Sequence, residues 1–538
     1  MTEDKTVQGT LRADGAPPGA VSPAAESAIS EDVKTLHELG YAQELLRGMG
    51  GFSNFAISFT IISILAGTLT LYGYGMNTGG PVDINIGWPI VGLFVLVVGL
   101  SMAEICSVFP TAGGLYFWAA KLAPEKSRAG WSWMVGWFDV MGEVGVTAGI
   151  DFGLALFLSA ELDLLFGYST AIPWHIIVIY AVVLLLHGLL NTFGVKLVAF
   201  LNDVSVWWHC IGVLVIIGVL AFVPSHHQSA SFIFTKFVNN TGFHAPVYVF
   251  LIGLLLAQYT FTGYHASIHM TEETRNSRTA PSWGIVMSIF ISLIFGWILL
   301  IGITAAIQPG TYSTAAAATV PPAQIFLNAI GHTGAVLLMA IVIVAQFYCG
   351  MASVTSNSRM IYAFSRDGAI PGSGLWKRIN PRTRTPTNSV WLATVAAFIL
   401  GLPYLWSATA YAAVTSIAVI GLYIAYVTPV YLKLRAGDRF KPGPWNLGRW
   451  SKPLGWTAVL WTCFIVILFV LPTVSPVTAT NFNYSIVAVS VVLFGAGGWY
   501  LASARKWFTG PKVQGSAAEL EAIERELAAV GRAMEGRS

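Results

Sequence analysis

The chain has 538 residues, of which 55% are hydrophobic and only 10% are charged. A soluble protein cannot bury that much apolar surface, so the composition excludes a soluble domain and predicts an all-α membrane protein. The net charge is +3, and the sequence contains no RNA- or DNA-binding motif, so we expect the lipid bilayer and no nucleic acid as a partner.

The N-terminal tail covers residues 1–50 and divides into two parts. Residues 1–35 are polar and rich in Ala, Pro and Gly, which predicts a segment without ordered structure. Residues 36–50 carry leucines at spacings that favour a short amphipathic helix on the membrane surface: Leu36, Leu39, Leu45 and Leu46.

Twelve apolar runs follow, each close to the roughly 20 residues that cross about 30 Å of hydrocarbon. The predicted spans are 53–76, 85–108, 131–158, 172–192, 197–223, 246–271, 283–307, 324–357, 388–405, 408–432, 454–474 and 483–504. They form one membrane domain over residues 51–506, and a C-terminal tail covers 507–538. In this tail the spacing of apolar residues predicts a short helix: Leu520, Ile523, Leu527 and Val530.

Positive charge is distributed unevenly between the loops. With an even number of spans, the outer loops carry only Lys236 of the 29 Lys and Arg residues. Positively charged loops stay in the cytoplasm, so this bias places both termini there and favours the cell membrane as the location.

Two of the predicted spans are interrupted at corresponding places. Span one contains Ala66, Gly67 and Thr68, and span six contains Gly263-Tyr264-His265. If spans 1–5 and 6–10 are two halves, each half begins with a broken helix. This is the pattern of a LeuT-type 5+5 inverted repeat, here with two extra C-terminal spans. The alternative is that these glycines only allow close helix packing.

Facing breaks would make a binding site for a zwitterion. A broken helix exposes N–H groups on one side and C=O groups on the other, which attract anions and cations respectively. We therefore place a substrate carboxylate near Ala66, Gly67 and Thr68. We place the substrate amine near Gly263, Tyr264 and His265.

Aromatic side chains near this site, among them Tyr259, suit a quaternary amine through cation–π contacts, whereas packing is their alternative role.

Several ionisable and hydroxyl side chains lie within the predicted spans. His209 is a candidate proton-coupling residue because histidine titrates near neutral pH; the alternative is a neutral histidine in a helix interface. Asp151 is a candidate for polar support of the site. Ser353 and Thr355 would hold Na⁺ or, alternatively, bond the preceding helical turn.

Asp139 and Glu143 are four residues apart on one helix face, which suits gating, packing or substrate contact.

The pattern of histidines and acids does not predict a metal centre or a cofactor. His265 and His269 are four residues apart and are followed by Glu272 and Glu273, which resembles half a zinc site. The HExxH motif and a second histidine cluster are missing from the sequence. No pairing of a nucleophile with a base is visible either, so we expect a protein that is not an enzyme.

These residues resemble the amino acid–polyamine–organocation superfamily and, within it, the amino acid/choline transporter family that includes GABA permeases. The resemblance runs from about Leu39 to Arg505. The motifs that carry it are Leu39-Gly40-Tyr41, Gly51 to Ser58, Gly79-Gly80-Pro81, Glu104 to Ser107, Pro110 to Tyr116, Thr147 to Asp151, Phe261 to Glu273 and Ser358 to Pro371.

The resemblance implies alternating access, with substrate bound at the breaks of spans one and six. The function expected is import of an amino acid or a GABA-like amine, driven by protons. The alternatives are a choline, organic-cation or polyamine transporter and an amino acid exchanger. His265 stands where relatives usually carry an acidic residue, and His209 where some proton-coupled relatives carry lysine.

Overall fold

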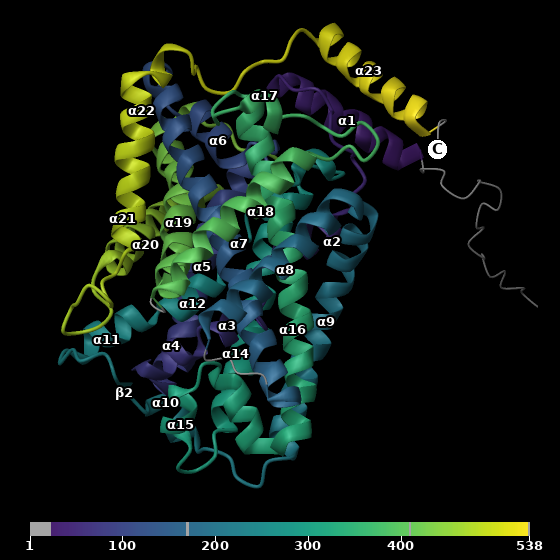
Figure 1. Cartoon of the computed structure of the whole chain (residues 1–538). Coiled ribbons are helices and arrows are strands. Elements are labelled where there is room, and N and C mark those ends of the chain that lie inside the picture. The colour runs from purple at the N-terminus through teal and green to yellow at the C-terminus, as the bar shows by residue number, and fades with distance from the viewer. Residues whose placement is uncertain (1–22, 168–171, 408–409, 536–538) are drawn as a thin grey trace, which may run out of the picture.

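The computed structural model describes residues 23–167, 172–407 and 410–535, most of them helical (Figure 1). Ten helical segments of this part are long and apolar enough to cross a membrane: Gly51–Asn77, Asp83–Cys106, Pro173–Phe193, Lys196–Phe222, Ala280–Ala305, Pro321–Arg366, Thr387–Leu405, Ala413–Arg439, Gly448–Val470 and Ser485–Ala502. The prediction of an all-α, multi-pass membrane protein is therefore confirmed.

The other two predicted spans are also helical, but they differ from these ten. The third predicted span lies in α7 (Arg128–Phe166), a helix of 39 residues that carries several acidic side chains. The sixth lies in α11 (Pro246–Gly253), α12 (Leu255–Thr260) and α13 (Ala266–His269), which are short and separated by non-helical residues.

The first predicted span is likewise divided, into α2 (Gly51–Ile62), α3 (Gly67–Thr70) and α4 (Tyr72–Asn77). The long helices of the bundle are α5 (Trp88–Cys106), α8 (Pro173–Phe193), α9 (Val195–Phe222), α14 (Ala280–Ala305), α16 (Pro321–Arg366), α18 (Thr387–Gly401), α19 (Ala410–Ala436) and α20 (Ser451–Val470). The last crossing segment is α21 (Ser485–Ser490), a π-helical turn and α22 (Gly497–Ala502). The first two residues of the predicted span 408–432 lie outside the described residues.

Shorter elements cover the two ends of the bundle. They are α6 (Gly114–Leu122), α10 (Ala230–Thr235), α15 (Tyr312–Ala317), α17 (Ser373–Trp376) and the strands β1 (Thr78–Gly79) and β2 (Val238–Asn239). The two strands pair antiparallel, with Thr78 opposite Asn239.

Helix α7 lies at the centre and packs against α6, α8, α16, α18 and α19. Its glycines allow α19 to come close. A Cβ atom at Gly145 would lie 3.1 Å from the Cα of Ala418, and one at Gly142 would lie 2.7 Å from the main-chain nitrogen of Leu422. Small residues at a helix interface let two main chains approach, which is a common source of stability in membrane bundles.

The two tails are more ordered than the sequence predicted. Residues 23–39 form α1 (Pro23–Leu39), so the expectation of no ordered structure is wrong for 23–35, and residues 1–22 lie outside the described residues. The helix predicted for 36–50 is also wrong, because α1 ends at Leu39 and the chain then runs without a helix to α2.

The predicted C-terminal helix is confirmed as α23 (Ala517–Glu535), which lies beside α1 (Figure 1). The Nε2 atom of His37 lies 2.8 Å from a carboxylate oxygen of Glu524 on α23.

One end of the bundle, where Lys and Arg residues gather, is called the basic end here. At this end α16 continues to Arg366, beyond the predicted boundary at residue 357, because its charged side chains are paired. Arg359 Nε donates to Glu273 at 2.8 Å, and the guanidinium of Arg366 donates twice to Glu272 at 2.9 and 3.0 Å. The main-chain N–H of Ala112 also donates to Glu272, at 3.0 Å. This buried network ties α16 to the segment that follows α13.

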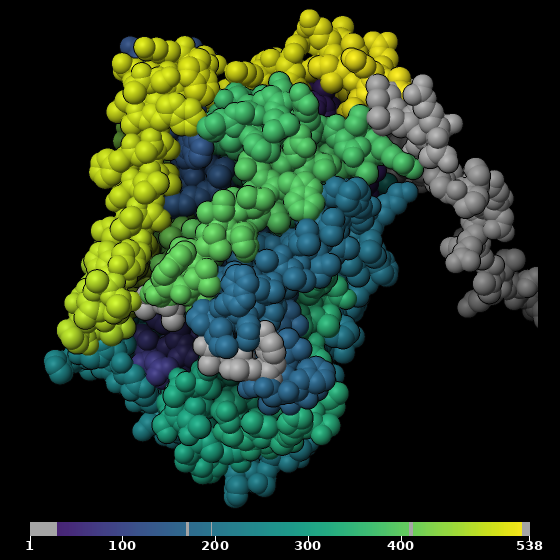
Figure 2. All heavy atoms as spheres, in the orientation of Figure 1, coloured from purple at the N-terminus to yellow at the C-terminus, as the bar shows by residue number. Residues whose placement is uncertain are grey.

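The flank of the molecule is apolar and grooved. Figure 2 shows α21 and α22 as a column set beside the rest of the bundle. A groove of about 1120 Å³ lies along it, lined mostly by apolar side chains that include Trp137, Ile417 and Trp499. Exposed apolar side chains on such a flank suit contact with lipid.

Replacement of Glu272 by Gln is expected to destabilise the protein. The change removes the partner of a buried guanidinium, and an uncompensated buried charge costs about 3–5 kcal/mol. The apparent melting temperature in detergent should fall by several degrees. The exposed Glu125 provides the control, since Glu125→Gln should leave the melting temperature unchanged; equal values for the two variants would contradict the prediction.

Candidate functional site

The first break lies between α2 and α3. Ser63 follows α2 with a φ of 38°, in the left-handed region, and this turns the chain out of the helix. The N–H groups of Ala66 and Gly67 both donate to the carbonyl of Ser63, at 2.8 and 2.9 Å. Thr68 bonds through its hydroxyl to the carbonyl of Ile64, in the preceding turn.

The second break lies between α12 and α13. Gly263 has a φ of 86°, which a residue with a side chain rarely adopts. The main-chain groups around it are bound by buried side chains. The carbonyl of Phe261 accepts from Tyr423 Oη at 2.6 Å, and that of Tyr264 accepts from Ser58 Oγ at 2.7 Å. The N–H of Gly263 donates to Tyr426 Oη at 3.4 Å.

The two breaks pack directly against each other. A Cβ atom at Gly67 would lie 2.8 Å from the side chain of Thr260, and a Cβ atom at Gly263 would overlap the side chain of Ile61. Glycine is therefore required at both positions by the close approach of one break to the other.

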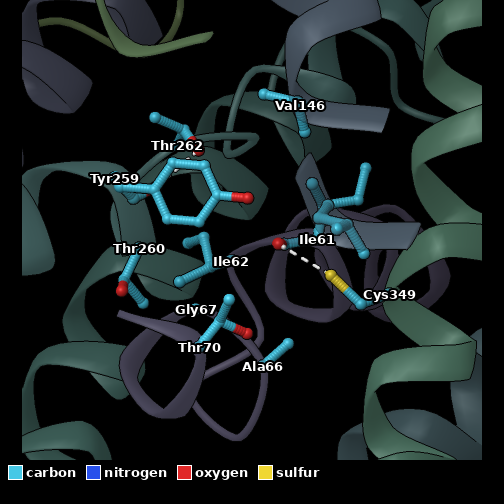
Figure 3. Close-up of a pocket in the computed structure, with 11 residues that line it drawn as sticks. Ile61, Ile62, Ala66, Gly67, Thr70, Val146, Tyr259, Thr260, Thr262 and Cys349 are labelled. Carbon is cyan, nitrogen blue, oxygen red and sulfur yellow. Dashed lines mark hydrogen bonds between the residues drawn. The ribbon is translucent and has the colours of Figure 1, made fainter. Parts of the chain in front are cut away.

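A small cavity with room for about one water molecule lies at this junction (Figure 3). Figure 3 shows Tyr259 on one side of it and Cys349, whose thiol donates to the carbonyl of Ile61 at 3.2 Å, on the other. The lining residues are Ile61, Ile62, Ala66, Gly67, Thr70, Val146, Ile150, Tyr259, Thr260, Thr262 and Cys349. None of these eleven residues carries a charge.

The structure brings some of the predicted substrate-binding residues together and not others. Ala66, Gly67 and Tyr259 line the cavity. The other four are buried outside the lining: Thr68, Gly263, Tyr264 and His265.

The sequence analysis missed the residues that α7 and α16 contribute. Val146 and Ile150 from α7 and Cys349 from α16 line the cavity, but nothing in their own sequence context marks them as site residues. Thr260 and Thr262 flank the predicted break, so their position in the sequence could have identified them as residues of the site.

His209 lies at the first break. Its Nδ1 donates to the carbonyl of Ser205 at 2.8 Å, and its Nε2 lies 2.7 Å from the hydroxyl of Ser63. Since a neutral imidazole has one donor and one acceptor, this pairing fits a neutral ring that accepts from Ser63. His209 on α9 is thus directly linked to the residue at which α2 ends.

The predicted supporting residues hold helices together outside the cavity. Ser353 bonds to Thr147 on α7 at 2.7 Å, and Thr355 donates to Asn191 on α8 at 2.6 Å. Asp151 lies 3.1 Å from Nδ1 of the buried His187. These contacts fit packing between α7, α8 and α16.

His265 faces α7 and α19. Its Nε2 lies 2.7 Å from Glu143, and its Nδ1 lies 2.6 Å from the hydroxyl of Tyr426. The acidic residue that contacts His265 of the sixth predicted span is therefore Glu143 of the third predicted span. Glu143 lies about one helical turn from Val146, which lines the cavity.

Comparison with known proteins identifies the family of the chain. A family model described as amino acid permease matches residues 49–493. The chain belongs to the amino acid permease family. It is 44% identical to the amino-acid permease BAT1 of Arabidopsis thaliana over 492 residues, covering 88% of this chain and 95% of that protein.

Two further relatives match at similar length. A BAT1 homolog of Oryza sativa subsp. japonica is 42% identical, covering 88% of this chain and 94% of that protein. The GABA-specific permease of Saccharomyces cerevisiae is 30% identical, covering 89% of this chain and 86% of that protein. The permease family confirms a transporter rather than an enzyme, and it implies an amino acid as the class of small-molecule substrate.

Replacement of Gly67 by Val is expected to abolish transport. The added carbons would enter the space held by Thr260 and fill the junction of the two breaks, so uptake into proteoliposomes should fall to the level of empty liposomes. Gly67→Ala, whose Cβ atom would already lie 2.8 Å from Thr260, should also lose most of the activity.

Gly218 on α9 is the matched control, because a Cβ atom there meets nothing within 4 Å. Gly218→Val should transport like the unmodified protein. Full transport by a well-folded Gly67→Val variant would show that the cavity is not the transport site.

Proposed function

We propose that this protein imports an amino acid or a GABA-like amine across the cell membrane by alternating access, driven by protons. Twelve spans would form a LeuT-type 5+5 inverted repeat with two additional spans, broken at spans one and six, and with both termini in the cytoplasm. The observation that carries the proposal is the small cavity with an uncharged lining that lies between the two breaks.

The absence of charge in the cavity lining favours a zwitterion over a cation. A cationic substrate such as choline or a polyamine would lose its hydration without gaining a carboxylate partner, which is costly in a buried site. A zwitterion is neutral overall, and carbonyl oxygens at the breaks keep a second lone pair that can accept from its ammonium group. We assign Ala66, Gly67 and Tyr259 to substrate contact on this basis.

The remaining predicted residues would act by shaping the breaks. Thr68, Gly263 and Tyr264 hold the main chain in its broken form, and His265 fixes the second break to α7. Asp151, Ser353 and Thr355 would support the surrounding helices.

Uptake of radiolabelled GABA into proteoliposomes tests the proposal. We expect accumulation that requires an inward proton gradient and that amino acids compete for, whereas choline and putrescine do not. Empty liposomes and a gradient collapsed by an ionophore are the controls. Competition by choline or putrescine alone would assign the protein to organic cations. Uptake that requires only preloaded substrate would identify an exchanger.

His209→Gln is expected to separate proton coupling from substrate binding. The amide can still bond to Ser63 but does not titrate, so gradient-driven accumulation should be lost while exchange of labelled for unlabelled substrate continues. His187→Gln, at a buried histidine away from the breaks, is the control. Undiminished gradient-driven accumulation in His209→Gln would rule out His209 as the coupling residue.

A further inference from the structure

A compact cluster of ionisable side chains lies between α7 and the second break, outside the cavity. Asp139 and Glu143 stand one turn apart on α7, and His265 and His269 stand one turn apart at the start and end of α13. All four are buried, with at most 1% of each residue exposed. Four groups of this kind form a set of potential ligands contributed by two different spans.

Three atoms of the cluster have no hydrogen-bond partner among the described residues: both carboxylate oxygens of Asp139 and Nε2 of His269. The His269 Nε2 lies 3.7 Å from Asp139 Oδ2, and the His265 Nε2 lies 3.9 Å from Asp139 Oδ1. These distances are too long for hydrogen bonds, which require about 3.2 Å or less. A hydrogen bond to His265 or His269 therefore does not account for the position of Asp139.

The distances fit ligands arranged around one ion more closely. The ligand atoms of Asp139, His265 and His269 all lie within 4.8 Å of one another. Ligands at about 2.0–2.1 Å from a tetrahedral ion are separated by roughly 3.3 Å. Small side-chain movements would bring these atoms to that separation. Glu143 Oε1 lies 3.9 Å from Nε2 of His269 and 2.7 Å from Nε2 of His265, so it can become the fourth ligand once its hydrogen bond to His265 is replaced by the ion.

The outer contacts orient His269 as metal ligands are usually oriented, whereas Nε2 of His265 is hydrogen-bonded to Glu143 at 2.7 Å and would exchange this bond for the ion. The Nδ1 of His269 donates to the carbonyl of Ala112 at 2.8 Å, which leaves the lone pair of Nε2 directed at Asp139. A main-chain carbonyl on the second ring nitrogen is a common support for a coordinating histidine. Ser356 donates to Glu143 at 2.7 Å and so fixes this carboxylate.

The charge of the cluster can be balanced by a cation or by protons. If both carboxylates are ionised and both imidazoles are neutral, the cluster carries two negative charges in a buried site. The ion pairs of Asp139 and Glu143 found among the described residues come from these two histidines and not from Lys or Arg. One divalent ion would neutralise the cluster. Two imidazole nitrogens favour Zn²⁺ or a similar first-row ion over Mg²⁺ and Ca²⁺, which prefer oxygen.

We propose that Asp139, His265 and His269, with Glu143 as the fourth ligand, bind a divalent transition-metal ion such as Zn²⁺ that bridges α7 and the second break. The sequence predicted no metal because it offered only the histidines and the acids that follow them. Glu272 is bound instead to Arg366, and the acids that complete the set come from a distant span. This site does not depend on the proposed substrate or on proton coupling.

Metal content tests the proposal directly. The full-length protein is purified in detergent, stripped with a chelator, incubated with Zn²⁺ alone and desalted before elemental analysis. We expect close to one Zn²⁺ per chain, and loss of this Zn²⁺ in Asp139→Asn and in His269→Gln. His187→Gln is the matched control, because His187 is a buried histidine paired with an aspartate elsewhere, and it should keep the Zn²⁺.

Binding of Co²⁺ to the unmodified protein gives a second measurement that needs no variant to fold. The intense visible absorption of a tetrahedral Co²⁺ centre is expected, and Zn²⁺ should remove it. Protein without bound Zn²⁺ and without this absorption would overturn the proposal. Protons would then balance the charge of the cluster. Unchanged Zn²⁺ content in both ligand variants would overturn it too, because the ion would then lie elsewhere.

Discussion

The fold depends on how the interrupted helices satisfy their main-chain polar groups within a membrane. An unpaired N–H or C=O group in hydrocarbon costs several kcal/mol, so a helix can be broken at depth only where protein supplies the missing partners. At the second break the partners are hydroxyl side chains, Tyr423 and Tyr426 on α19 and Ser58 on α2. At the first break the main-chain carbonyl of Ser63 accepts from the N–H groups of Ala66 and Gly67.

This requirement explains why α19 and α7 occupy the centre of the bundle. The tyrosines of α19 must reach the second break, and the glycines of α7 allow α19 to approach closely enough for this. The polar contacts then continue beyond the break. Tyr426 bonds to His265, and His265 bonds to Glu143 on α7. On the other side, His269 bonds to the carbonyl of Ala112, whose N–H group binds Glu272 at the basic end.

The fold could be predicted from the sequence more fully than the site, and the reason is physical. Membrane spans follow from local composition, so most of the long helices were predicted close to their observed positions. Gly263 was visible at the second interruption because glycine marks an unusual backbone angle, whereas the first interruption begins at Ser63, four residues before the predicted Gly67. The residues that bind His265 at the second break could not be predicted. Tyr426 and Glu143 lie more than a hundred residues from His265, and helical periodicity does not specify which helices meet.

The positions of the charged side chains relative to the cavity constrain the class of substrate. Glu143 lies one turn from Val146 in the cavity wall, yet it is directed to His265 and Ser356 and not into the cavity. A buried carboxylate facing the cavity would favour cationic substrates and oppose the carboxylate of an amino acid. Because the ionisable groups are paired one turn away, the cavity stays neutral. For the proposed zwitterionic substrate, discrimination would then depend on the shape set by apolar side chains such as Ile61 and Ile150.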